Sequence, residues 1–171
     1  TNLNVDKFRN GDVIPEAKTD EEWTAASTYK TPAWCYLKNS IDSGLIYGKL
    51  YNHYAVNDSR GLAPQGWNVP SDAEWTNLTT YFGGETVAGT KLKNTCGWYY
   101  GVNGSNTSGF AGLPGGTRGP TGKFYNIGTY GSWWSSSQSA FYSAWSRYLG
   151  SSNGTVNRDD YNNKGTGLSV R

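Results

Sequence analysis

The sequence predicts an α+β fold, in which two short helices pack on short antiparallel strands joined by long irregular loops. Helix-start signatures fall in the first half of the chain, whereas from Gly83 onward glycines recur every few residues and apolar residues form short groups bounded by turn formers. Helices that precede strands favour α+β over alternating βαβ units. We expect one domain over 1–171, because a fold of this size buries roughly 70% of its unfolded surface.

Two segments carry the same helix-start signature. In "TDEEW" (19–23) and "SDAEW" (71–75), a hydroxyl N-cap is followed three residues later by a glutamate, which completes a capping box. The first helix is predicted over 20–27, with Trp23 and Ala26 facing inward. The second is predicted over 72–82, where the stripe Trp75, Leu78 and Phe82 is apolar and Gly83-Gly84 ends the helix.

The remaining elements are expected to be strands no longer than the typical five or six residues. Short apolar groups between turn formers place them at 45–48, 109–113, 132–136, 143–149, 154–158 and 166–171.

Charge and hydropathy limit the classes of partner. The formal net charge of +2 is small and the lysines and arginines are dispersed, so we expect no nucleic-acid partner. No apolar run reaches the 18 residues of a membrane span, so we expect no span in this segment. Abundant Asn, Ser, Gly, Tyr and Trp with little charge favour an extracellular or cell-surface domain over a cytosolic enzyme.

Cys35 and Cys96 leave two alternatives open. A disulfide between them would close a long loop and contribute on the order of 4 kcal/mol, whereas aromatic neighbours suit two free buried thiols. Two cysteines without a histidine cluster do not make a zinc site. Asp159 and Asp160 could offer oxygens to calcium, but their spacing is not that of an EF-hand loop, and a solvated turn is the preferred interpretation. No other cofactor is expected.

Catalytic patterns are weak. His53 is the only histidine, and its aromatic neighbours favour a packed or partly exposed ring over a catalytic one. Glu22 and Glu74 are occupied in the capping boxes, and no other carboxylate pair has the context that general acid–base work requires. "GLPGGTRG" (112–119) lacks the ending of a phosphate-binding loop, and we interpret it as a turn beside a binding surface.

Several ordered motifs resemble one known family. "GLAPQGWNVPSDAEWTNLTTYFGG", "SGFAGLPGGTRG", "GKFYNIGTYGSWWSSS", "AWSRYL" and the closing "GLSVR" are similar, in that order, to the Fibrobacter succinogenes major paralogous domain family. The resemblance covers nearly the whole chain. His53 stands where the family commonly has Trp, and Asn68 where it often has His.

The resemblance implies a C-type lectin-like fold, in the branch shared with formylglycine-generating enzymes and with the variable proteins of diversity-generating retroelements. Those enzymes use a cysteine pair in the C-terminal part, whereas this chain has no cysteine after Cys96. The "EPN", "QPD" and "WND" triplets of calcium-dependent lectins are also missing from the sequence. The resemblance therefore supports neither oxidase activity nor a lectin-type calcium site.

The C-terminal part, about 118–171, resembles the variable-protein branch in its sequence pattern, in which fixed framework residues alternate with positions free to change. We assign Trp133, Trp134, Trp145, Arg147, Leu149, Gly167 and Val170 to the framework. The candidate binding face consists of Tyr125, Tyr130, Ser132, Ser137, Gln138, Ser139, Phe141, Tyr142, Ser146, Tyr148, Asp159, Asp160, Tyr161 and Asn162. Tyrosine offers a large amphipathic contact area with few torsions, while Ser, Gly and Asn supply adaptable hydrogen bonds. The alternative is that these polar residues only fill exposed loops.

We therefore expect a non-enzymatic ligand-binding domain, whose target is a protein or glycan on a cell surface. A retroelement-diversified variable protein, on a bacterial surface or a phage particle, is the form of this hypothesis that the resemblance favours. A carbohydrate-binding module or adhesin domain of a bacterial surface protein is the main alternative. A divergent relative of the formylglycine-generating enzymes is less favoured.

Overall fold

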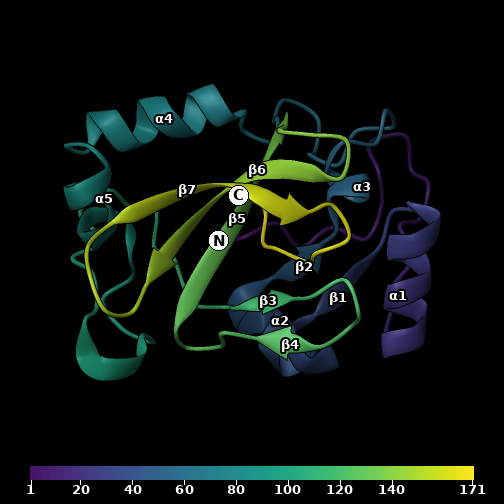
Figure 1. Ribbon diagram of the computed structural model, residues 1–171, viewed down its shortest axis with the longest axis horizontal. Coiled ribbons are helices and arrows are strands. Elements are labelled where there is room, and N and C mark those ends of the chain that lie inside the picture. The colour runs from purple at the N-terminus through teal and green to yellow at the C-terminus, as the bar shows by residue number, and fades with distance from the viewer.

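The computed structural model describes residues 1–171, except that it does not describe the burial of Gly101. It has the α+β fold expected from the sequence (Figure 1). In chain order the elements are α1 (Asp20–Tyr29), β1 (Trp34–Tyr36), η1 (Leu37–Asn39), α2 (Ile41–Tyr47), β2 (Lys49–Tyr51), α3 (His53–Val56), α4 (Asp72–Tyr81), α5 (Glu85–Leu92), η2 (Tyr99–Gly101), β3 (Thr117–Arg118), β4 (Phe124–Tyr125), β5 (Tyr130–Gln138), β6 (Ser143–Gly150) and β7 (Val156–Asn163).

Both predicted helices are present with their capping boxes. The Thr19 hydroxyl accepts a hydrogen bond from the Glu22 amide (3.1 Å), and the Glu22 carboxylate accepts one from the Thr19 amide (3.0 Å). Ser71 and Glu74 do the same at the start of α4. Trp23 is buried on α1, as the sequence predicts. Each cap satisfies amides that would otherwise lack a partner at the helix start, so these starts were predictable from local sequence.

Three further α-helices were not predicted. α2 occupies most of the segment predicted as a strand at 45–48, so that prediction was wrong. α2 leaves Leu45 and Ile46 exposed while Gly44 lies against the Tyr36 ring, so its apolar run does not mark a core face. α5 follows Gly84 without any side-chain cap. α3 is a single short turn.

The largest sheet is antiparallel, with the order β5-β6-β7. Trp133 pairs with Arg147, and Tyr148 pairs with Asn157. The strands predicted at 132–136 and 143–149 are confirmed but extend to nine and eight residues. The strand predicted at 154–158 lies later, at Val156–Asn163, so Asp159 and Asp160 belong to a strand and not to the solvated turn that we expected.

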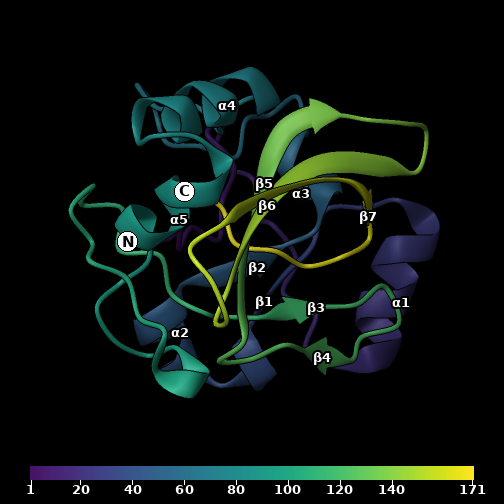
Figure 2. The same cartoon turned by 60° about the vertical axis from the view of Figure 1, so that its left-hand side comes forward.

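The segment predicted as a strand at 166–171 forms isolated bridges instead. Leu168 pairs with Tyr51 of β2, and Ser169 pairs with Trp133 of β5. The chain therefore returns between the large sheet and the β1–β2 pair, as Figure 2 shows. In the segment 109–113, also predicted as a strand, Gly112 makes one isolated bridge to Lys93.

The buried core is built around indole rings. Trp133 packs in one cluster with Trp75 and Leu92 beneath α4 and α5, while Trp134 packs in another with Tyr51. Adjacent residues of a strand point to opposite faces, so this pair fixes β5 from both sides. Of the other assigned framework residues, Arg147, Leu149, Gly167 and Val170 are also buried.

The two cysteines are free. Cys35 is buried, and burial raises the pKa of its thiol to about 12. Cys96 is exposed, so neither the disulfide nor a pair of buried thiols describes the structure. Among the described residues, no group of three or more His, Cys, Asp and Glu side chains is arranged to hold a metal ion. Likewise, none of the described helices is long and apolar enough to cross a bilayer.

Candidate binding face

The turn between β5 and β6 presents two aromatic rings to solvent. Phe141 is 71% exposed and Tyr142 61%, and their rings meet edge to face with centroids 4.6 Å apart. The amides of Ser139 and Ala140 both donate to the Ser143 carbonyl at 3.2 Å, which closes the turn. Figure 2 shows this hairpin extending beyond the neighbouring loops. The structure thus brings Gln138, Ser139 and both rings, all predicted for the face, to one hairpin tip.

Lys164, which the sequence analysis did not single out, supports this tip from below. Its side chain is almost fully buried, and Nζ donates to the Gln138 Oε1 (2.7 Å) and to the Phe141 carbonyl (2.9 Å). Burial, together with the nearby Lys30, lowers the pKa of Lys164. A lone lysine after an Asn-rich strand gives no sequence signal for this role, because its partners lie more than 20 residues earlier.

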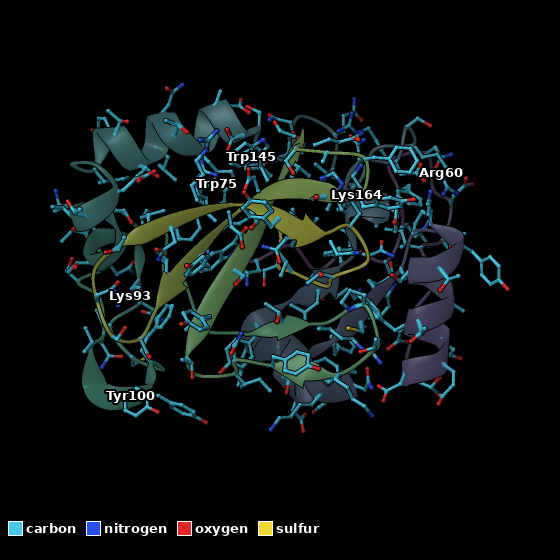
Figure 3. The ribbon with its side chains drawn as sticks, viewed as in Figure 1. Arg60, Trp75, Lys93, Tyr100, Trp145 and Lys164 are labelled. Carbon is cyan, nitrogen blue, oxygen red and sulfur yellow. The ribbon has the colours of Figure 1, made fainter. Side chains whose placement is uncertain are left out.

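A hollow of about 380 Å³ lies beside the tip, between it and α3. The side chains that line it come from four segments distant in sequence: Lys30, Pro32, His53, Tyr54, Asn57, Asp58, Gln138, Phe141 and Lys164. Lys30 follows α1, with its ammonium 4.6 Å from the centroid of the Phe141 ring. In Figure 3, Lys164 lies on the same side of the molecule as Arg60.

His53 is buried at the base of this hollow. Its Nε2 lies 3.1 Å from the Ser135 carbonyl, and its ring meets that of Trp134 edge to face at 5.1 Å. Burial lowers the pKa of His53 to about 4, so the ring is neutral near pH 7. A carbonyl oxygen can only accept, so the proton is on Nε2 and Nδ1 is left as an acceptor. Of the two expected alternatives, a packed or a partly exposed ring, the structure shows the packed one.

A second group of predicted residues is joined by hydrogen bonds across β6 and β7. The Asn162 Nδ2 donates to the Ser146 hydroxyl (2.8 Å) and to the Asp159 carboxylate (2.9 Å). The other oxygen of Asp159 accepts from the Tyr161 amide (2.9 Å), and the Tyr161 ring is 86% exposed. The Ser139 hydroxyl donates to the Asp160 carbonyl, which ties the hairpin tip to β7.

Two predicted face residues are not at the surface. Ser146 is 1% exposed, because β6 lies between two strands and Asn162 covers its hydroxyl. Ser132 is 7% exposed, and its carbonyl accepts from Ser169 in the returning C-terminal segment. The expectation of exposure was therefore wrong for both serines. They belong to the layer beneath the face.

The predicted tyrosines differ in their environments. Tyr130 and Tyr148 are half-buried and meet edge to face at 5.4 Å, and burial raises the pKa of Tyr148. Tyr125 is 50% exposed, but it lies on β4, away from the β5–β6 hairpin tip in both Figures 1 and 2. The structure therefore does not bring Tyr125 to the tip.

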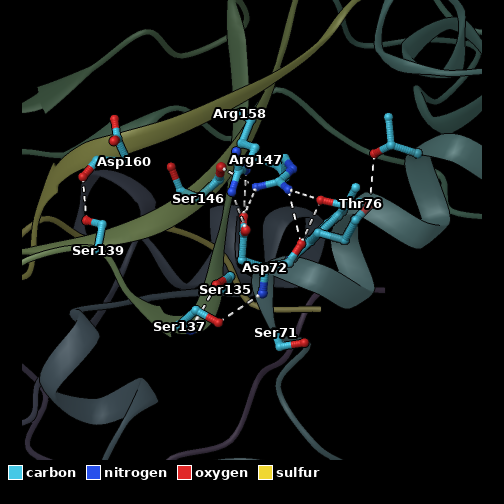
Figure 4. Close-up of polar contacts among 12 residues, drawn as sticks. Ser71, Asp72, Thr76, Ser135, Ser137, Ser139, Ser146, Arg147, Arg158 and Asp160 are labelled. Carbon is cyan, nitrogen blue, oxygen red and sulfur yellow. Dashed lines mark hydrogen bonds and ion pairs between the residues drawn. The ribbon is translucent and has the colours of Figure 1, made fainter.

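Asp72 connects α4 to the strands of the face (Figure 4). Its carboxylate pairs with Arg147 (2.7 Å) and with Arg158 (2.7 Å), and its amide donates to the Ser137 hydroxyl (3.0 Å). Burial alone would raise the pKa of Asp72, but hydrogen bonds from Arg158 and Arg147 outweigh it and lower the pKa. Ser137, predicted for the face, is half-buried and contributes to this junction.

Trp145 lies above the same junction. We assigned it to the framework, but the ring is half-buried rather than buried, with the Arg158 guanidinium 3.8 Å from its centroid. Figure 3 shows it close to the sheet, below α4. Trp145 therefore contributes a partly exposed aromatic surface on β6, where the irregular register sets it opposite Asp160 and Tyr161 of β7, and the sequence pattern alone did not indicate this.

The chain matches a known sequence family. A sequence model of the Fibrobacter succinogenes major domain matches residues 1–171. No curated protein and no solved structure matches the chain.

Proposed function

The chain belongs to the Fibrobacter succinogenes major domain family, and we propose that it is a non-enzymatic domain that binds a protein or glycan ligand on a cell surface. One observation carries the proposal. The exposed rings Phe141, Tyr142 and Tyr161 are contributed by the hairpin tip and β7, which are joined by the hydrogen bond from Ser139 to the Asp160 carbonyl. The ligand contacts these rings and the polar groups between them.

The proposed binding face is an exposed surface that lies on tightly packed strands. Trp133 and Trp134 are at most 1% exposed, so the strands beneath the face are rigidly packed. The three exposed aromatic rings leave apolar area in contact with water. Large apolar patches on the surface of a folded protein commonly mark interaction sites. Amphipathic rings mixed with small polar residues suit recognition because few torsions are lost on binding.

The finer proposal is that the domain has a C-type lectin-like fold and is a variable protein diversified by a retroelement. The resemblance of the motifs supports it, as does the separation of framework from surface residues within the C-terminal part. Asn codons mutated at adenine yield Asp, Tyr, Ser and Gly, and two of these residue types, Asp and Tyr, stand beside Asn in "DDYNN" (159–163). Such a domain acts outside the cell, on a bacterial surface or a phage particle.

A carbohydrate-binding module or adhesin is the second candidate, and the hollow beside Phe141 favours it. An aromatic face next to amide side chains suits sugar rings as well as protein side chains. A divergent formylglycine-generating-type oxidase is less favoured. Burial raises the pKa of Cys35 to about 12, which leaves its thiol protonated and unreactive, while Cys96 is exposed.

Binding of the purified domain to glycan arrays and to panels of bacterial cells tests the proposal. The double variant Phe141→Ala/Tyr142→Ala is compared with Tyr81→Ala, which removes an exposed tyrosine (82%) from α4, outside the face. We expect the double variant to lose binding by at least about tenfold, as loss of a central aromatic contact does, while Tyr81→Ala binds like the parent. Equal binding by all three proteins would contradict the proposal.

A further inference from the structure

The hollow beside the hairpin tip holds two ammonium groups without a carboxylate partner among the described residues. Lys164 uses two of its three donors on Gln138 and on the Phe141 carbonyl, so one N–H remains. Lys30 lies over the Phe141 and Tyr142 rings, at 4.6 and 5.3 Å from their centroids. The buried lysine Lys93, in contrast, donates to three backbone carbonyls.

The acidic side chain that also lines the hollow is already neutralised. Asp58 accepts from Arg60 through both carboxylate oxygens, at 2.8 and 2.9 Å. These bonds hold the pKa of Asp58 below its ordinary value, so the carboxylate stays ionised and paired. Arg60 also pairs with Asp12 (3.2 Å), so Asp58, Arg60 and Asp12 together carry one net negative charge. The two ammonium groups of Lys30 and Lys164 exceed that charge, and the hollow therefore attracts an anion.

The other lining groups suit a polyhydroxylated ring. The Phe141 ring is 71% exposed and offers a flat apolar surface. Asn57, Gln138 and Tyr54 bring amide and hydroxyl groups to the same hollow, and the unprotonated Nδ1 of His53 is an acceptor. Sugars present an apolar ring face and a rim of hydroxyls, and both features have partners here.

We propose that this hollow binds a sugar acid, with its carboxylate between Lys30 and Lys164 and its ring against Phe141. The inference rests on the proposed ligand-binding function and specifies the ligand class for one part of the face. A bare inorganic anion would use the lysines but not Phe141 or the amides. A neutral sugar would leave the cationic groups without a counter-charge.

Titration of the ¹⁵N-labelled domain with methyl β-D-glucuronide, followed by NMR, tests the proposal. Methyl β-D-glucoside and sodium phosphate are titrated in parallel. We expect the glucuronide to bind at least about tenfold more tightly than either. The glucoside lacks the charge-assisted hydrogen bonds to the lysines, and phosphate lacks the contacts with Phe141 and the amides. Shifts should centre on the amides of Tyr54, Gln138 and Phe141.

Two lysine variants test whether the positive charge of Lys30 in the hollow, rather than the loss of any surface lysine, accounts for glucuronide binding. Lys30→Ala should weaken glucuronide binding by about tenfold or more and leave glucoside binding unchanged. Lys18→Ala, at the other end of α1, removes an exposed lysine that pairs with Glu16 and should bind like the parent. Phe141→Ala should weaken both sugars. Lys164→Ala is less suitable as a first variant, because Lys164 also supports the hairpin tip.

Three results would overturn the inference: equal binding of glucuronide and glucoside, phosphate binding as tight as that of the glucuronide, or no shift with any probe. None of them would decide the proposed function, because cell and array binding through Phe141 and Tyr142 is measured separately. Loss of that binding contrast would overturn the proposed function whatever the glucuronide result.

Discussion

Acidification should destabilise the protein through a single buried histidine. The folded state holds the pKa of His53 at about 4 through burial, against an ordinary value of 6.5. As the pH falls below 6.5, His53 binds a proton in the unfolded chain but not in the folded chain, so the free energy of unfolding decreases. Between about pH 7 and about pH 5 the two values give a loss of about 2 kcal/mol.

Urea unfolding at several pH values in this window measures the effect. The carboxylates whose pKa values are lowered, such as Asp72 and Asp58, lose their contribution only below about pH 4.5, where the unfolded groups begin to take up protons. His53→Gln keeps an amide donor for the Ser135 carbonyl but does not titrate, so its stability should be nearly flat over the window. Parallel loss of stability in the parent and in His53→Gln would refute the reasoning.

Three further substitutions have expected results. Trp133→Ala should cost about 3 to 5 kcal/mol in urea unfolding, because the ring is 1% exposed and packs against Phe110; a cost below about 1 kcal/mol would show that it is not core. Asp72→Asn should cost about 3 kcal/mol, because it leaves the buried Arg147 without its counter-charge; equal stability of variant and parent would show that the α4 junction is dispensable. Tyr161→Ala should change stability by less than about 0.5 kcal/mol while binding to the cell or array ligand falls, since the ring is 86% exposed; a large loss of stability would place the ring in a packed contact.

The helix starts that depend only on neighbouring residues were predictable from the sequence. The starts of α1 and α4 follow from hydroxyl caps that are bonded within their own turn. α5 was missed because its cap is Gly84 and because it contains Gly89, a poor helix former. A Cβ at Gly89 would lie 2.4 Å from the Gly154 carbonyl oxygen, so tertiary packing and not propensity selects glycine there.

The boundaries of β7 depend on its partner strand. "NRDDYNN" has low strand propensity, and pairing with β6 carries the strand to Asn163. The burial of Ser132 and Ser146 likewise depends on neighbouring segments. The returning C-terminal segment bonds to the Ser132 carbonyl, and Asn162 of β7 covers the Ser146 hydroxyl. A small polar residue looks the same in sequence whether it is exposed or covered, so composition alone could not separate these two serines from the face.

The hollow shows the limit of sequence reasoning most clearly. Lys30, His53, Gln138 and Lys164 are spread over more than 130 positions, and only the fold brings them together. The sequence did indicate Gln138 and Phe141, because they follow the paired tryptophans in a polar run. Both lysines were missed, since isolated lysines in a chain of small net charge carry no positional signal.

Randomising the exposed positions tests most directly whether the face can vary on a fixed framework. A displayed library would vary the exposed Gln138, Phe141, Tyr142 and Tyr161 together with the half-buried Asp160. A matched library would vary five buried positions: Trp133, Trp134, Ala144, Arg147 and Leu149. We expect most members of the first library to fold with melting temperatures within about 5 °C of the parent and to yield binders to unrelated targets, while most of the second unfold. Similar unfolding in both libraries, or a folded first library that yields no binders, would contradict this division between framework and face.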